Sequence, residues 1–181
     1  MSRKLPRLTL AGLLAVLSAA LPAEEVCMKR VFNEYCLGGD MDAQVRAPKP
    51  VIHQQREGDR FAVVYADGDG SAYVMSFKGR IYKVLRRYDP STILRFNDLE
   101  KILTGKYGPP NDLSRYPAYA RNRASRIGAI RRGEGRAELV WEPRGEPWAV
   151  TLAWNRELGL HLYYTAKELD AQMEMAAESG L

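Results

Sequence analysis

The sequence contains few of the residues from which catalytic and metal sites are usually built. It has only two histidines and two cysteines in 181 residues. Neither His53 nor His161 lies at metal-ligand spacing from a cysteine or a pair of carboxylates, so we predict no metal site and no cofactor, and we expect His161 at the surface or at a sheet edge. The glycine-rich loops that bind nucleotide phosphates and the G-x-S-x-G turn of serine hydrolases are also absent. The sequence therefore presents no recognisable catalytic constellation.

Long hydrophobic segments are lacking after the first 23 residues. The run LTLAGLLAVLSAAL, residues 8–21, is about 14 residues long, whereas a membrane-spanning helix needs roughly 20. Three basic residues precede this run and small residues follow it, which is the order of a secretory signal peptide. We predict a signal peptide over residues 1–23, cleavage near Ala23, no transmembrane segment in the mature chain and a periplasmic location.

The excess of positive charge belongs mainly to this signal peptide. The whole chain has 27 Lys and Arg against 22 Asp and Glu, a net charge of +5. Residues 1–23 contain three of the basic residues and no acidic one, so the remaining 158 of the 181 residues carry 24 basic and 22 acidic side chains, net +2. This small excess gives no support to a nucleic-acid partner. A chain of this length fits one domain with its own core, and we predict a single domain over residues 24–181.

The two cysteines, Cys27 and Cys36, lie at the start of the predicted mature chain. Export would place them in an oxidising compartment, where a cysteine pair is usually bridged. Residues 24–37 nevertheless have helical spacing, with Cys27, Val31 and Tyr35 on one face. In a helix the two Cα atoms would lie roughly 13 Å apart, whereas a disulfide needs less than about 7 Å. We expect a first helix over residues 24–37, and the disulfide remains an open alternative.

Turn signals divide much of the rest of the chain into short segments with the composition of β-strands. Strands joined by tight turns are antiparallel neighbours. We predict an α+β fold in which an antiparallel sheet, built from two β-meanders, packs against short helices. The expected strands cover residues 60–66, 71–77, 80–88, 126–132, 136–142, 148–154 and 160–165, with helices at 97–107 and 166–178. A connector is expected at 40–59, with a helical turn at 42–45 left open, and a long loop at 109–125.

One amphipathic helix is expected at the centre of the chain, in the stretch NDLEKILTGKYGPP. Asn97 is a good N-cap, and Gly108 followed by two prolines ends the helix. The residues expected on its buried face are Leu99, Ile102, Leu103 and Tyr107. The clearest period of two in the chain lies in residues 148–154, and we predict one core that contains Leu99, Leu103, Trp148, Leu152 and Trp154.

The segment FNDLEKILTGKYGPP resembles the helix followed by Tyr-Gly-x-Pro that occurs in many small, uncharacterised Gram-negative envelope proteins. It is also loosely similar to the small α/β modules of outer-membrane assembly lipoproteins and of β-lactamase-inhibitor-like domains. This chain lacks the lipid-anchor cysteine of the former, because Cys27 follows Glu24, Glu25 and Val26. The resemblance covers about 15 residues and implies an interaction module, without supplying functional residues.

A run of arginines follows the central helix. Residues 115–136 contain seven arginines and two tyrosines against one acidic residue, Glu134. Arginine suits planar, bidentate contact with carboxylates or phosphates, and both Tyr and Arg are enriched at the energetic centres of interfaces. The alternative is an ordinary solvated face. The residues that we predict to bind a partner are Arg115, Tyr116, Tyr119, Arg121, Arg123 and Arg126.

These observations favour a binding protein over an enzyme. We predict an exported, periplasmic interaction protein of the envelope-accessory or inhibitor type, without catalytic activity, whose partner is an envelope protein or an anionic envelope component. The alternative is a small envelope hydrolase that uses scattered carboxylates. A pocket with two close, desolvated carboxylates would favour the hydrolase, and a convex Arg/Tyr surface would favour the binding protein.

Overall fold

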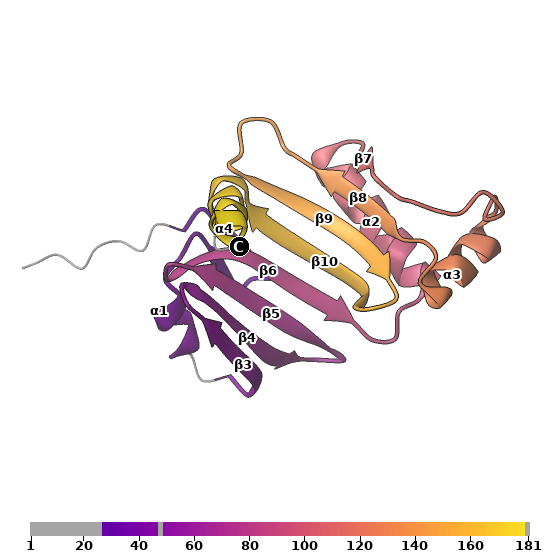
Figure 1. Cartoon of the computed structure of the whole chain (residues 1–181). Helices are drawn as coiled ribbons and strands as arrows, with labels where there is room; N and C mark the ends of the chain where they lie inside the picture. The colour runs from indigo at the N-terminus through magenta and orange to yellow at the C-terminus, as the bar shows by residue number, and fades with distance from the viewer. Residues whose placement is uncertain (1–26, 47–48, 180–181) are drawn as a thin grey trace, which may run out of the picture.

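An eight-stranded antiparallel sheet organises the molecule. In the computed structural model of the chain (Figure 1), which describes residues 27–46 and 49–179, the strand order is β3-β4-β5-β6-β10-β9-β8-β7. These strands are β3 (Val51–Glu57), β4 (Arg60–Asp67), β5 (Gly70–Phe77), β6 (Arg80–Tyr88), β7 (Asn111–Asp112), β8 (Ala137–Trp141), β9 (Trp148–Asn155) and β10 (Gly159–Ala166). A two-stranded sheet is formed by β1 (Lys29–Val31) and β2 (Tyr35–Leu37), and the helices are α1 (Met41–Val45), α2 (Ile93–Tyr107), α3 (Arg123–Arg132) and α4 (Lys167–Ser179). The predicted signal peptide and its cleavage site lie outside the described residues.

Two meanders build the large sheet. Strands β3 to β6 are neighbours in chain order, and so are β7 to β10. The meanders join where β10 pairs with β6, with Leu160 opposite Tyr88. Helix α2 leads from β6 to the edge of the sheet where β7 lies (Figure 1). The predicted α+β fold with an antiparallel sheet is therefore confirmed.

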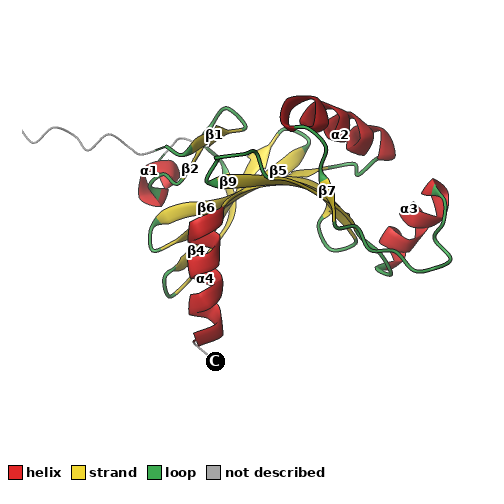
Figure 2. Ribbon diagram, turned by 90° about the horizontal axis from the view of Figure 1, so that it is seen from above, coloured by secondary structure: helices red, strands yellow, loops and turns green. Residues whose placement is uncertain are grey.

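One face of the sheet carries the core. Trp148 of β9 and Tyr164 of β10 lie on this face, with ring centres 5.9 Å apart. Tyr107 of α2 packs edge-on against Trp148 at 5.6 Å, and Phe32 of the β1–β2 turn packs against Tyr164 at 5.7 Å. Figure 2 shows α2 and the β1–β2 hairpin on this side of the sheet, with α4 projecting from the other side. Helix and hairpin therefore cover different halves of the same apolar face.

Helix α2 begins earlier than predicted. Its N-cap is Thr92, whose side chain accepts a hydrogen bond of 3.2 Å from the amide of Arg95, so the expected cap at Asn97 is wrong. Asn97 instead lies inside the helix. Threonine can accept this bond much as asparagine does, and a start at Thr92 adds the apolar side chain of Phe96 to the face that packs on the core.

The predicted core is confirmed, whereas the expected burial of Ile102 on the helix face is wrong. The buried cluster contains Leu103, Trp148, Leu152 and Trp154, with Leu99 and Tyr107 packed against it. Ile102, by contrast, is 63% exposed. It adjoins Leu103 in sequence, and successive residues of a helix point in directions about 100° apart. The narrow contact of α2 with the sheet therefore buries one of these two neighbours and leaves the other in solvent.

A hairpin replaces the first predicted helix. Val31 of β1 lies opposite Tyr35 of β2, and the chain reverses through Phe32 and Asn33, whose φ angles are 51° and 61°. Left-handed residues of this kind cannot continue a right-handed helix. The prediction of a helix over residues 24–37 is therefore wrong. The spacing of Val31 and Tyr35 misled it, because directly opposed residues of a hairpin also share one face.

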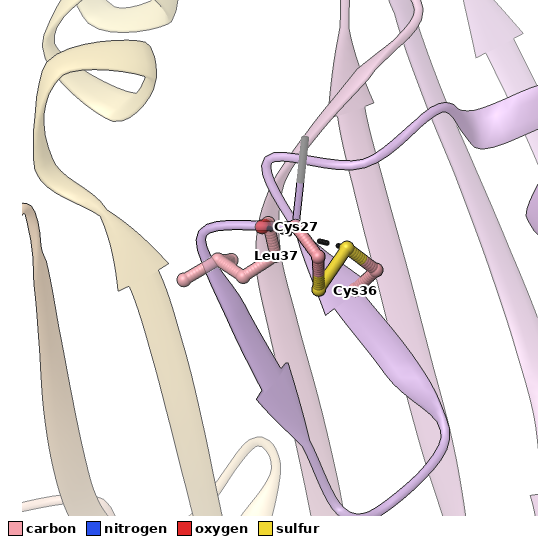
Figure 3. The surroundings of a disulfide bond; sticks show 3 residues. All are labelled: Cys27, Cys36 and Leu37. Atoms are coloured by element: carbon pink, nitrogen blue, oxygen red, sulfur yellow. Dashed lines mark hydrogen bonds between the residues drawn. A yellow bond between two sulfur atoms is a disulfide. The ribbon is translucent and has the colours of Figure 1, made fainter. Parts of the chain in front are cut away.

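A disulfide joins the start of this hairpin to β2. The Cα atoms of Cys27 and Cys36 are 5.3 Å apart and the two sulfur atoms are bonded (Figure 3). The Cα separation that argued against the bridge applied only to a helix. In the hairpin the two Cα atoms lie within disulfide distance. The disulfide, which the sequence left as an open alternative, is therefore present in the structure.

Helix α3 replaces a predicted strand. The segment 126–132 belongs to this helix, so its assignment to the second meander is wrong. The side chain of Asn122 caps the helix, and Gly133, with φ of 78°, closes it in the left-handed conformation. The fourth strand of the second meander is instead β7, which lies within the predicted 109–125 loop.

Two further expectations fail in the sheet. The predicted connector at 40–59 contains, besides the helical turn of α1, the edge strand β3, whose seven residues are all exposed. A strand without a buried face has no apolar alternation for a sequence pattern to detect. His161 lies in β10, between β6 and β9, and is only 3% exposed, so its predicted place at the surface or at an edge is wrong.

Candidate functional site

Exposed arginines gather around α3. We call the following six the arginine cluster: Arg115, Arg121, Arg123, Arg126, Arg131 and Arg156. Within residues 27–46 and 49–179, none of the six has a carboxylate within 4.0 Å of its guanidinium. Two other arginines of the region are paired, Arg132 with Glu134 at 3.1 Å and Arg136 with Glu138 at 3.0 Å. Glu134 and Glu138 are therefore engaged by these two arginines, and the six arginines of the cluster are left without a carboxylate partner in the described residues.

The local sequence fixes the position of α3 and hence of the cluster. Ala129 and Ile130 are buried at 0% and 2% exposure and anchor one side of the helix. The segment before the helix is held by a bridge between Arg115 and Arg136, whose backbone amides and carbonyls bond each other at 2.8 and 2.9 Å. The arginines of α3 remain exposed while these two residues hold the helix on the core.

The two predicted tyrosines occupy different environments. Tyr116 is half-buried and packs against the core, with the guanidinium of Arg126 5.0 Å from its ring centre. Burial raises the pKa of its hydroxyl. Tyr119 is 53% exposed, and its hydroxyl donates to the carboxylate of Glu134 and accepts from Arg132 at 2.7 Å. Tyr116 thus anchors the loop, whereas Tyr119 presents an exposed ring held at its hydroxyl end.

A cleft of about 220 Å³ lies between α2 and α3. Its floor is apolar and includes Leu139 of β8, Trp154 of β9 and Ile130 of α3, all nearly fully buried. Phe96 of α2 lines the cleft beside Trp154, with ring centres 6.2 Å apart. Of the six predicted partner-binding residues, Tyr116, Arg123 and Arg126 line this cleft, and Arg115, Tyr119 and Arg121 do not.

Charges of both signs line the rim of the cleft. Arg123 and Arg126 come from α3, Glu100 from α2 and Asp112 from β7. In the part of the chain that the structure describes, none of these four groups has an opposite charge within 4.0 Å. Neither carboxylate was predicted from the sequence, because Glu100 lies inside the central helix pattern and nothing near Asp112 indicated that it lies across a cleft from α2.

The buried histidine of the sheet, His161, lies away from this cleft. His161 pairs with Ala153 and with Arg87, so its side chain points to the face opposite Trp154. Burial lowers the pKa of His161. Its 3.0 Å contact with the Gly159 carbonyl and the charge on Glu138 raise the pKa, but by less than burial lowers it. Among the described residues, no group of three His, Cys, Asp or Glu side chains is arranged to hold a metal ion.

Comparison with known proteins gives no family. A scan against protein-family models and a search of curated proteins found no match.

The described helices include none with the length and apolar character needed to cross a membrane.

Solved structures show only distant likeness. The chain is similar to a cysteine-rich secretory protein from Staphylococcus aureus subsp. aureus Mu50, with a TM-score of 0.43, 8% identity and coverage of 76% of this chain and 47% of that one. It is also similar to an extracellular protein containing an SCP domain from Bacillus anthracis str. Ames, with a TM-score of 0.41, 10% identity and coverage of 84% and 51%. The chain thus spans about half the length of each, and likeness at this level assigns no fold family or activity.

Proposed function

We propose that the chain is an exported envelope protein that acts by binding an acidic partner through the arginine cluster. The observation that carries this proposal is the set of six exposed arginines around α3 that have no carboxylate partner among the described residues. An arginine that has no carboxylate partner keeps most of its N–H donors available for a carboxylate or phosphate of another molecule. The partner is an envelope protein with an acidic surface or an anionic envelope component.

The packing of α3 supports this function. A helix held by buried Ala129 and Ile130 loses little conformational freedom when a partner binds. The exposed ring of Tyr119 adds a large, stiff contact surface beside the arginines. The protein as a whole carries little net charge after loss of residues 1–23. Attraction of an acidic partner therefore depends on this local concentration of charge, and we expect it to weaken as salt is added.

Export rests on two observations. The first is the order of basic, apolar and small residues in the first 23 positions. The second is the disulfide between Cys27 and Cys36, because structural disulfides persist in oxidising compartments such as the periplasm and are rare in the cytosol. A periplasmic location with cleavage near Ala23 is the form of export that we propose.

A hydrolase remains the second candidate because two carboxylates line the α2–α3 cleft. Glu100 is half-buried, but Asp112 is exposed. A pair of close, desolvated carboxylates would favour hydrolysis, and exposed Asp112 does not complete such a pair. The geometry therefore favours binding over hydrolysis at this site.

Charge reversal tests the binding function. The double variant Arg121→Glu/Arg123→Glu is expected to lose capture of the partner that the wild-type mature protein retains from an envelope extract. It is also expected to unfold in urea at nearly the wild-type concentration, because exposed charges contribute little to stability. The matched control is Arg30→Glu/Arg144→Glu, which changes the net charge equally at two exposed sites outside the cluster.

The control separates a local site from overall charge. Equal loss of capture in both double variants would show that net charge alone drives binding, and equal retention in both would show that the cluster is not the site. Co-sedimentation with vesicles that contain an anionic phospholipid distinguishes a lipid component from a protein partner.

A further inference from the structure

The α2–α3 cleft is lined by apolar and acidic residues as well as by arginines of the cluster. Two arginines, Arg123 and Arg126, and two acidic residues, Glu100 and Asp112, line it together with apolar residues. We propose that this cleft binds a small apolar zwitterion of the amino-acid class. The guanidinium groups bind its carboxylate, Glu100 and Asp112 attract its ammonium group, and the floor takes its side chain. This ligand site goes beyond the proposed function, which requires only the arginines.

The floor of the cleft is suited to an apolar side chain. Leu139 and Trp154 are buried at 6% and 5% exposure, and Phe96 and Ile127 complete the apolar lining. Burial of apolar surface against such a lining is favourable by roughly 25 cal/mol per Å². The volume of about 220 Å³ is below the roughly 300–1,000 Å³ of clefts that hold drug-sized ligands. The occupant is therefore about the size of a single amino acid.

The carboxylate-binding side is already positioned. The guanidinium of Arg126 lies over the ring of Tyr116, and its Nε donates to the carbonyl of Ala120 at 3.4 Å. Arg123 precedes Arg126 by three residues on α3, so both project from the same side of the helix. The two guanidinium groups can bind the two oxygens of a carboxylate, and Arg126, which is held in this way, loses less side-chain freedom on binding.

The opposite charges select a zwitterion over an anion. Glu100 and Asp112 line the same cleft as the arginines, yet in the described chain neither has a cation within 4.0 Å. A dicarboxylate or phosphate in the cleft would be repelled by these two groups, whereas an ammonium group would be attracted. An acidic peptide bound at the arginines of the cluster that lie outside the cleft would leave Glu100 and Asp112 without a partner. Charge complementarity therefore favours a ligand that carries both signs.

Calorimetric titration of the disulfide-bonded mature protein with amino acids tests this site. Leucine and phenylalanine are expected to bind saturably, and serine, which lacks the apolar side chain, is expected to bind at least about tenfold more weakly. N-acetyl-leucine, without the ammonium group, and leucinamide, without the carboxylate, should each lose about tenfold or more in affinity. If no apolar amino acid binds, or if N-acetyl-leucine binds as tightly as leucine, the proposal is wrong.

Two neutralising variants locate the binding. Arg126→Gln and Glu100→Gln are each expected to weaken leucine binding by about tenfold or more, with far-UV circular dichroism and thermal melting confirming that both remain folded. Arg121→Gln is the matched control, because Arg121 belongs to the arginine cluster but does not line the cleft. Leucine affinity that is unchanged in both Arg126→Gln and Glu100→Gln would place any binding elsewhere.

The same variants keep this site separate from the proposed function. Glu100→Gln is expected to lose leucine binding and to retain capture of the acidic partner, whereas Arg121→Glu should reduce capture and retain leucine binding. If leucine binding is not found, capture of the acidic partner can still be tested, and the reverse also holds.

Discussion

The side chain of Asn122 and the side chain of Ser125 cap each other's backbone. Asn122 Oδ1 accepts a 2.9 Å hydrogen bond from the amide of Ser125, and Ser125 Oγ accepts one of 3.1 Å from the amide of Asn122. The pair satisfies two amides that the start of α3 would otherwise leave without an intrahelical partner. It also sets the residue at which α3 begins, and so the direction in which Arg123 and Arg126 leave the helix.

Removal of this cap should destabilise the protein measurably. Asn122→Ala is expected to lower the free energy of unfolding by about 1 kcal/mol, because the amide of Ser125 loses its acceptor. Urea unfolding followed by circular dichroism measures the change. The control is Arg123→Ala, at an exposed position in the same turn but outside the reciprocal pair, and it should change stability by less than about 0.5 kcal/mol. Equal effects of the two variants would contradict the capping role.

The contact between α2 and the sheet predicts a second stability difference. Leu103 is 4% exposed within the core, so Leu103→Ala should cost roughly 2–5 kcal/mol of unfolding free energy. Ile102→Ala removes a side chain of similar size that is largely in solvent, and it should cost less than about 1 kcal/mol. A loss below about 1 kcal/mol for Leu103→Ala would show that α2 does not pack on the sheet in solution.

The strands were largely predictable because turns enclose them. Six strands agree closely with the sequence prediction, from Arg60–Asp67 to Gly159–Ala166, since glycine-containing turns and apolar alternation mark their ends and faces. Strand β3 gave no such signal, because it buries neither face. Helix α3 could have been found from Asn122, Ser125 and Gly133, which are its start and stop signals, but the short apolar pattern of 126–132 was compatible with a strand as well.

The candidate site was predictable only in part. The arginines are visible as a run in the sequence, and Tyr116, Arg123 and Arg126 do line the cleft. Glu100, Asp112 and Leu139 reach the same cleft from three different elements. Their meeting depends on how α2 crosses the sheet, and no local pattern encodes a contact between segments this far apart.

Buried His161 should make stability depend on pH. Burial holds the pKa of His161 below its ordinary value of 6.5, so between these two values the unfolded chain binds a proton more readily than the folded chain. Stability should therefore fall as the pH is lowered through about 6.5 and should change no further, for this group, below its folded pKa. The measurement is urea unfolding of wild type and His161→Gln at about pH 7.5 and 5.5.

The comparison between variants isolates this histidine. His161→Gln should lose part of the fall in stability that the wild type shows between the two pH values, whereas His53→Gln, at an exposed position, should keep it. The same pH dependence in wild type and His161→Gln would mean that His161 does not contribute.

Export predicts the N-terminus of the mature protein. Protein recovered from the periplasm of a Gram-negative expression host should begin close to Glu24, as N-terminal sequencing would show. It should contain no free thiol, since Cys27 and Cys36 are bridged. Recovery of protein that retains Met1 in the inner membrane would contradict both the cleavage and the location.

The two edges of the sheet differ in what they offer to a further strand. Strand β7 has two residues and follows Pro109 and Pro110, which have no amide hydrogen to donate. Strand β3 runs for seven exposed residues without a proline, and in the described structure its ladder partner is β4 alone. The longer unpaired backbone edge is therefore β3, at the opposite edge of the sheet from the β7 residue that lines the cleft. The open backbone edge and the candidate side-chain site thus lie at different ends of the sheet and share no residue.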